Sequence, residues 1–168
     1  MTGTASELRI PADPEYIVVA KRAAAGFGVV AGFGVEAVDD LVIAVTQACE
    51  NAIAATMRAV GRNRGQVRLT FRLEDQRLEV QVRSLCGRGE DAAECPPEVG
   101  QPEVAGAPGK PVATSGQALI DEAARVREAA AAADLALRVM GLFVDDCRYR
   151  VDQRTGSLRV RLTKYRVS

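Results

Sequence analysis

The segment from Val38 to Arg58 carries two different sets of side chains, each at helical spacing. One set is apolar and would bury one face of a helix: Val38, Leu41, Val42, Val45, Cys49, Ala52 and Ile53. The other set falls on a second face and forms a mostly polar stripe: Gln47, Asn51, Ala54 and Arg58. The first face builds a core, whereas the second either meets a ligand or is simply solvated.

The size and charge of the chain limit its possible partners. A chain of 168 residues with 48% hydrophobic residues fits one domain with a real core, and we predict a single domain over 1–168. Basic and acidic residues number 22 each, so no overall field favours nucleic acid or an anionic membrane. No apolar run approaches the roughly 20 residues of a membrane span, and the N-terminus lacks signal-peptide features. We expect a cytoplasmic protein with local, shape-based recognition.

The cysteines and the missing histidine restrict the chemistry. The four cysteines lie far apart and no histidine is present, so we predict no zinc site. Cys49 and Cys147 sit in apolar patterns and are expected in the core, while Cys86 and Cys95 flank a loop and are either reactive or merely exposed. We expect reduced thiols. Without histidine, catalysis would need carboxylates or a bound nucleotide.

The first part of the sequence predicts a short strand and two helices. Residues 7–10 alternate polar and apolar side chains, as a strand does. Asp13 can then cap a helix whose first position is Pro14. This helix should end near residues 32–34, and a second helix should run over 36–60.

Two hairpins complete the predicted sheet. Residues 66–73 and 77–83 alternate apolar and polar side chains, which predicts a hairpin with one covered face. Residues 145–151 and 158–164 predict a closing hairpin whose outer face carries alternating arginines. The order of elements predicts an α/β two-layer sandwich, a mixed and mostly antiparallel sheet with helices on one face.

Between the hairpins the pattern changes twice. Residues 86–116 contain five of the seven prolines, so we predict a lid, a binding loop or a disordered loop within the domain. Residues 117–144 return to helical composition. In that segment we expect a set of large apolar side chains to be mostly buried: Leu135, Leu137, Val139, Met140, Leu142 and Phe143.

This order, together with residues 11–16, 45–53 and 144–149, resembles the bacterial anti-sigma-factor serine/threonine kinases (RsbW-like) of the Bergerat, or GHKL, ATPase superfamily. The resemblance implies a GHKL ATPase-like fold, ATP or ADP with Mg as cofactors, and transcription regulation by partner switching. It also implies a homodimer that binds a sigma factor and an anti-anti-sigma protein. Relatives use a basic residue of the first helix to bind the sigma factor, which points to Lys21 with Arg22; the alternative is that both are ordinary solvated side chains.

The family's second helix typically reads Ser-Glu-Ala-Cys-Thr-Asn-Ala, where Glu polarises the nucleophile and Asn holds magnesium. The matching residues are Thr46–Ala52. Asn51 keeps an amide oxygen suited to Mg, but Gln47 stands at the position of the catalytic base and cannot accept a proton. Loss of a general base costs a factor of about 10² to 10⁴ in rate. Glu50 is a candidate substitute, although it lies about 100° around the helix from Asn51.

The family's adenine motif, Asp-x-Gly-x-Gly, is only partly kept. Gly87 and Gly89 preserve the glycine spacing. Leu85 stands in place of the Asp that accepts a hydrogen bond from the adenine amino group, and Ser84 fits only after a shift of one residue. The specific acceptor for adenine would therefore be lost.

The third motif, Gly-Leu-Gly-Leu, aligns with residues 134–137, where Asp134 and Ala136 replace both glycines. In relatives, phosphates approach backbone amides at this helix start. We therefore expect weak or absent nucleotide binding in an anti-sigma-like regulatory protein. The alternatives are an active serine/threonine kinase with a rearranged site around Asn51 and Glu50, the ATPase domain of a histidine kinase, and a dimeric scaffold without a sigma partner.

Overall fold

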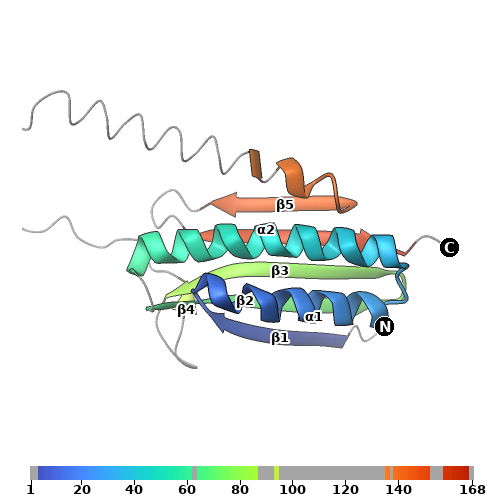
Figure 1. The fold of residues 1–168 in the computed structure, drawn as a ribbon, viewed down its shortest axis with the longest axis horizontal. Helices are drawn as coiled ribbons and strands as arrows, with labels where there is room; N and C mark the ends of the chain where they lie inside the picture. The colour runs from blue at the N-terminus through green and yellow to red at the C-terminus, as the bar shows by residue number, and fades with distance from the viewer. Residues whose placement is uncertain are drawn as a thin grey trace, which may run out of the picture.

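The computed structural model describes residues 4–61, 64–86, 93–94, 135–136, 138–151 and 157–166. Its elements are β1 (Thr4–Pro11), the 3-10 turn η1 (Pro14–Tyr16), α1 (Ile17–Val30), α2 (Val35–Val60), β2 (Gly65–Glu74), β3 (Arg77–Cys86), β4 (Ala93–Glu94), β5 (Asp146–Val151) and β6 (Leu158–Tyr165). The six-stranded sheet has the order β1-β2-β3-β6-β5, and β4 pairs with β3. Figure 1 shows α1 and α2 side by side across one face of this sheet. The predicted two-layer sandwich is confirmed, but the expectation of a mixed sheet is not: every pairing among the described strands is antiparallel.

The turn η1, which leads directly into α1, begins with its own capping residues. The side chain of Asp13 accepts a hydrogen bond from the backbone N–H of Glu15 at 3.0 Å, and Pro14 takes the first position of η1. Because Pro14 has no N–H to donate, it fits a position where that group would lack a partner in any case. The helix ends at Val30, and Gly32 then adopts a positive φ of 74°, a backbone conformation that glycine adopts without strain.

The core lies between α2 and the inner face of the sheet. The predicted apolar stripe of α2 is confirmed, since Leu41, Val45, Cys49, Ala52 and Ile53 are buried, with Val38 and Val42 partly buried against them. The strands contribute their inward residues: Val67, Leu69, Phe71, Leu78, Val80, Val82, Leu158, Val160 and Leu162. From α1, the ring of Phe27 stacks on that of Phe71 with centroids 4.3 Å apart. Both helices are thereby fixed on the sheet.

At its C-terminal end, α2 approaches the sheet too closely for a side chain at Gly65. A Cβ atom on Gly65 would collide with Cγ2 of Thr56 and would lie 2.9 Å from the carbonyl oxygen of Leu85. Thr56 is itself fully buried, and its hydroxyl donates to the carbonyl oxygen of Ala52 at 2.7 Å. Glycine at the start of β2 therefore lets the end of α2 rest directly on the strands.

The apolar residues before β5 are less buried than we predicted. Residues 135–136 and 138–140 are helical, and Met140 is fully buried. Leu135, Val139 and Leu142, however, are 65%, 36% and 80% exposed, so the prediction of burial is wrong for them. Their spacing of four and three residues places them on a face of the helical turn that does not meet the core. Leu137 lies outside the described residues.

The strand β4 and a disulfide were not predicted. Cys86 is disulfide-bonded, whereas Cys49 and Cys147 are free, so the expectation of reduced thiols is wrong for Cys86. The pairing of β3 with β4 sets Cys86 opposite Ala93 and so returns the chain toward this cysteine. The rest of the predicted loop 86–116, including Cys95, lies outside the described residues. No helix in the part of the chain that the structure describes is long and apolar enough to cross a membrane.

Candidate functional site

The polar side of α2 brings Gln47 and Glu50 into contact. The side-chain amide of Gln47 donates through Nε2 to Oε2 of Glu50, with the two atoms 2.7 Å apart. Residues three apart on a helix are neighbours, which is why this pair can form. Glu50 is exposed and Gln47 is half-buried. A carboxylate therefore lies directly beside the amide at position 47.

Asn51 follows one residue later and has a polar atom without a partner. Its Nδ2 is buried, and no hydrogen-bond acceptor reaches it among the described residues. A buried donor that lacks a partner costs about 1 to 3 kcal/mol. The amide also carries an oxygen of the kind that Mg²⁺ accepts as a ligand. Asn51 is thus the residue of the polar stripe whose hydrogen bonding is left incomplete.

The end of β3 presents Ser84, not Leu85, to α2. Ser84 Oγ donates to the carbonyl oxygen of Ala52 at 3.2 Å and accepts from the backbone N–H of Leu158 at 3.4 Å. Side chains alternate along a strand, so Leu85 points to the opposite face. Leu85 is 1% exposed. Ser84 matches the family's adenine motif only after a shift of one residue, but the inward alternation of Leu78, Val80 and Val82 already predicts an inward position for Ser84.

The other residues assigned by resemblance are only partly covered. Gly87, Gly89 and Asp134 lie outside the described residues. Ala136 lies in a helical segment and is half-buried. The structure therefore brings Gln47 and Glu50 into contact on α2, next to Asn51, and joins Ser84 of β3 to the carbonyl oxygen of Ala52. Gly87, Gly89 and Asp134 of the predicted site are not described.

Lys21 and Arg22 belong to a different surface. Both are exposed on α1, whereas the polar stripe lies on α2. Exposed apolar side chains also lie on α1: Val18, at 51%, is one turn from Lys21 and Arg22, and Val29, at 67%, is about two turns from them. A mixed basic and apolar helix surface of this kind is compatible with protein binding.

The described free thiols are poor nucleophiles. Burial, with a smaller contribution from the charge of Glu50, raises the pKa of Cys49 to about 12. Burial, followed by the charge of Asp146, also raises the pKa of Cys147. With these raised pKa values, both thiols stay protonated at neutral pH. The thiolate is the reactive form, so neither thiol is an effective nucleophile. Chemistry on α2 would therefore depend on its carboxylate and amide groups.

A family model described as a histidine kinase-like ATPase domain matches residues 10–164. The chain belongs to this family. The match runs from the last part of β1 through β6, so it includes every element that carries the polar stripe and Ser84. The GHKL-type fold expected from the sequence is thereby confirmed.

Among curated proteins, this ATPase-family chain is similar to several serine-protein kinases RsbW. Identity is 36% over 76 residues for the protein of Bacillus velezensis, 34% over 76 residues for that of Bacillus pumilus and 33% over 75 residues for that of Listeria innocua. Each match covers 45% of this chain. The chain spans about half the length of these relatives, at 46%, 47% and 46% respectively. The similarity to RsbW-type kinases inferred from the sequence is confirmed.

Proposed function

We propose that this chain is an anti-sigma-factor-like regulatory protein whose nucleotide binding is weakened or lost. In this proposal it binds a sigma factor, an anti-anti-sigma protein or both in a partner-switching system. The observation that carries the proposal is the hydrogen bond of Gln47. Its amide stands at the position that the resemblance assigns to the catalytic base, and it donates to Glu50 at 2.7 Å. An amide takes up no proton at neutral pH, so position 47 provides no general base.

The residues around Gln47 fit the family's cofactor only in part. Asn51 offers an amide oxygen to Mg²⁺ and has an unpaired Nδ2 that a ligand oxygen would satisfy. Leu85 supplies no acceptor for an adenine amino group, and Ala136 is helical where relatives have a glycine turn. Ser84, which already bonds to Ala52 and Leu158, is engaged in the fold. These observations support weak magnesium-dependent binding at most.

The surface proposed for the sigma factor is the exposed side of α1 around Lys21 and Arg22. Both cations are available to carboxylates of a partner, and the exposed Val18 and Val29 add apolar area. We propose that the same protein forms homodimers, as the resemblance to RsbW implies. The surface requires no nucleotide chemistry, so partner binding would survive the loss of phosphoryl transfer.

A second candidate function is an active serine/threonine kinase. It is favoured by the contact between Gln47 and Glu50, because this contact holds a carboxylate one helical turn from the position of the missing base. In this alternative, Glu50 orients the attacking hydroxyl of an anti-anti-sigma protein. Asn51 would hold the magnesium ion.

Calorimetric titration with Mg-ATP and Mg-ADP separates the two functions. We expect little or no heat from the wild type at millimolar nucleotide, and no transfer of radiolabel from ATP to the cognate anti-anti-sigma protein. The variant Gln47→Glu tests whether a carboxylate alone restores transfer, with Asn51→Ala as its control. Robust transfer by the wild type that Glu50→Gln abolishes would replace the proposal by the kinase alternative.

The partner surface is tested by charge reversal on α1. We expect the double variant K21E/R22E to weaken binding to the cognate sigma factor by about tenfold or more, because interfacial charges act on affinity and association rate. The matched control is R72E/R77E, which makes the same charge change on the sheet. An unchanged Kd for K21E/R22E would remove both residues from the proposal, and light scattering reports whether the protein is a dimer.

A further inference from the structure

Five arginines stand in one row across the sheet, one from each long strand. Arg9 of β1 is opposite Arg68 of β2, which is opposite Arg83 of β3. Arg83 is opposite Arg159 of β6, which in turn is opposite Arg150 of β5. We call these residues the arginine row. Directly paired residues share a face, so the arginine row crosses the whole sheet at right angles to its strands.

The arginine row lies on the face of the sheet that α1 and α2 do not cover. The residues next to the row in β2, β3 and β6, such as Val67, Val82 and Val160, are buried toward the helices, so the arginines of these strands point the other way. Figure 1 shows both helices on a single side of the sheet. Arg150 and Arg159 are exposed, and the side chains of Arg9 and Arg68 keep 34% and 24% of their surface accessible.

The face as a whole is strongly basic, although the chain is neutral. Its described strand positions hold nine arginines: Arg9, Arg68, Arg72, Arg77, Arg83, Arg148, Arg150, Arg159 and Arg161. They hold five carboxylates: Glu7, Glu74, Glu79, Glu94 and Asp146. Since basic and acidic residues number 22 each in the sequence, the remainder of the chain carries an excess of acids. Positive charge is therefore concentrated on this one face.

Such an arrangement costs stability. Like charges directly opposite each other on neighbouring strands repel, and the arginine row contains four such pairs in succession. Glu7 contacts Arg9 and Arg68, Arg83 Nη2 donates to Oε1 of Gln81 at 3.0 Å, and Glu79 and Asp146 contact arginines outside the row. Arg9, Arg83 and Arg159 make further interactions within the chain, and carboxylates of an anionic partner would reduce the remaining repulsion along the row.

The chemistry of the row favours carboxylates of a protein over nucleic acid. All the basic residues of this face are arginines, whose planar guanidinium groups bind carboxylates through two parallel hydrogen bonds. Among the described strand positions of the face, Tyr165 is the single aromatic residue, and it lies at the end of β6 away from the row. Stacking platforms for bases need several aromatic side chains. The flanking carboxylates would also repel a broad anionic surface such as a duplex or a membrane.

The dimensions of the row fit a short extended segment. Neighbouring strands lie about 4.8 Å apart, so five strands span roughly 19 Å. An extended peptide rises about 3.3 Å per residue and would cover this distance with about six residues.

We propose that the arginine row is a docking site for an acidic, extended segment of a partner protein. The segment lies across the strands and places carboxylates against successive guanidinium groups. This site is on the opposite layer of the domain from Lys21, Arg22 and the polar stripe of α2. The inference therefore does not depend on the proposed sigma-factor function, and the α1 variants that test that function leave the arginine row unchanged.

The experiment uses a fluorescent peptide of six Glu-Ser repeats with both ends blocked. Its binding to the full chain is measured by anisotropy at low and at moderate salt. The variant R68Q/R83Q/R159Q removes three charges from the centre of the row while keeping side-chain length. The matched control R72Q/R77Q/R148Q removes three arginine charges from the same face outside the row. A dT7 oligonucleotide, which carries the same number of negative charges as the peptide, serves as the nucleic-acid probe.

We expect the wild type to bind the peptide, the row variant to lose about tenfold or more in affinity, and the control to lose less than about threefold. Binding should weaken with salt, because exposed charges are screened. No peptide binding by the wild type, equal losses in both triple variants, or tighter binding of dT7 than of the peptide would each overturn the proposal. Thermal unfolding checks that the variants fold. If the row variant does not, R150Q/R159Q replaces it, with an expected intermediate loss of affinity.

Discussion

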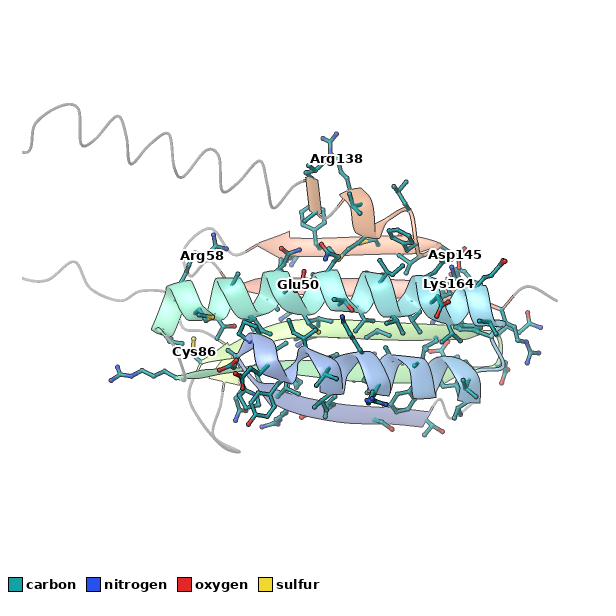
Figure 2. All side chains as sticks on the ribbon, in the orientation of Figure 1. Glu50, Arg58, Cys86, Arg138, Asp145 and Lys164 are labelled. Carbon is teal, nitrogen blue, oxygen red and sulfur yellow. The ribbon has the colours of Figure 1, made fainter. Side chains whose placement is uncertain are left out.

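Lys164 Nζ lies 3.0 Å from Oδ2 of Asp40 and thereby joins β6 to α2 across 124 positions of the sequence. The same ammonium group donates to the carbonyl oxygen of Phe143 at 2.8 Å. Nearby, Oδ2 of Asp145 accepts from the backbone N–H of Tyr165 at 2.7 Å. Figure 2 shows Lys164 and Asp145 together at the N-terminal end of α2. One lysine thus fastens the first turns of α2, the end of β6 and the turn before β5.

Replacing Lys164 by Met should lower the free energy of unfolding by about 1 to 3 kcal/mol. The Lys164 side chain is only 12% exposed, so its loss leaves the carbonyl of Phe143 without this donor in a poorly hydrated place. Asp40→Asn is the matched control. Because the Asp40 side chain is 40% exposed, solvent screens its charge and the expected loss is smaller. Urea denaturation measures both, and equal losses would contradict this account.

Gly65→Ala should destabilise the protein by about 1 to 3 kcal/mol through overpacking. The new Cβ would collide with Cγ2 of Thr56 and approach the carbonyl oxygen of Leu85. Thr56→Ser removes that methyl group while keeping the hydroxyl that donates to Ala52. We expect G65A/T56S to recover part of the loss in urea denaturation. A double variant no more stable than Gly65→Ala alone would show that the methyl group is not the cause.

Gly26→Ala should have the opposite effect. Gly26 lies inside α1, is exposed, and has no other group within 4 Å of the position of a Cβ. Alanine favours the helix over glycine by about 1 kcal/mol at such a site. A higher urea midpoint with an unchanged m-value is the expected result. A lower midpoint would mean that α1 requires glycine here for a contact that the structure does not contain.

Cys49 should make stability fall at alkaline pH. Burial raises its pKa from 9.0 to about 12, so between these values the unfolded chain releases a proton that the folded protein keeps. The unfolded state then binds fewer protons, and the free energy of unfolding falls as pH rises, by up to about 1.4 kcal/mol per unit for one group. The contribution is fully present below pH 9.

The measurement compares urea denaturation of the wild type and Cys49→Ala from pH 7 to pH 11. Every other titrating group is common to both proteins, so the difference between the two curves isolates Cys49. We expect a constant difference below about pH 9 and a steady change above it in favour of the variant. Parallel curves over the whole range would contradict the buried, protonated thiol.

The fold could be predicted because its signals are local and repetitive. Alternation along residues 66–73 and 77–83 specified the β2–β3 hairpin, and the helical spacing from Val38 to Ile53 specified the buried face of α2. The capping pair Asp13 and Pro14 marked the entry to α1. Each of these signals depends on the periodicity of a single element, which a sequence displays directly.

The predictions that failed concern contacts between elements, which the periodicity of a single element does not display. Leu135, Val139 and Leu142 are apolar, but nothing in their own sequence says which face of a short helical turn meets the core. The hydrogen bond between Gln47 and Glu50 depends on the rotamers of both side chains. Their spacing of three residues permits this bond but does not require it. The inward position of Ser84 follows from the alternation of side chains along β3. The family's adenine motif, however, places Leu85 at the acceptor position.

The strand β6 lies between β3 and β5, although it follows both in the sequence. During synthesis, the edge of β3 from Arg77 to Arg83 therefore waits for its partner until residues 158–165 have left the ribosome. An unpaired strand edge is a template for pairing with other chains. The nascent protein thus keeps an unpaired edge at the future middle of its sheet from the synthesis of β3 until that of β6, and a fragment that stops before β6 would retain that edge permanently.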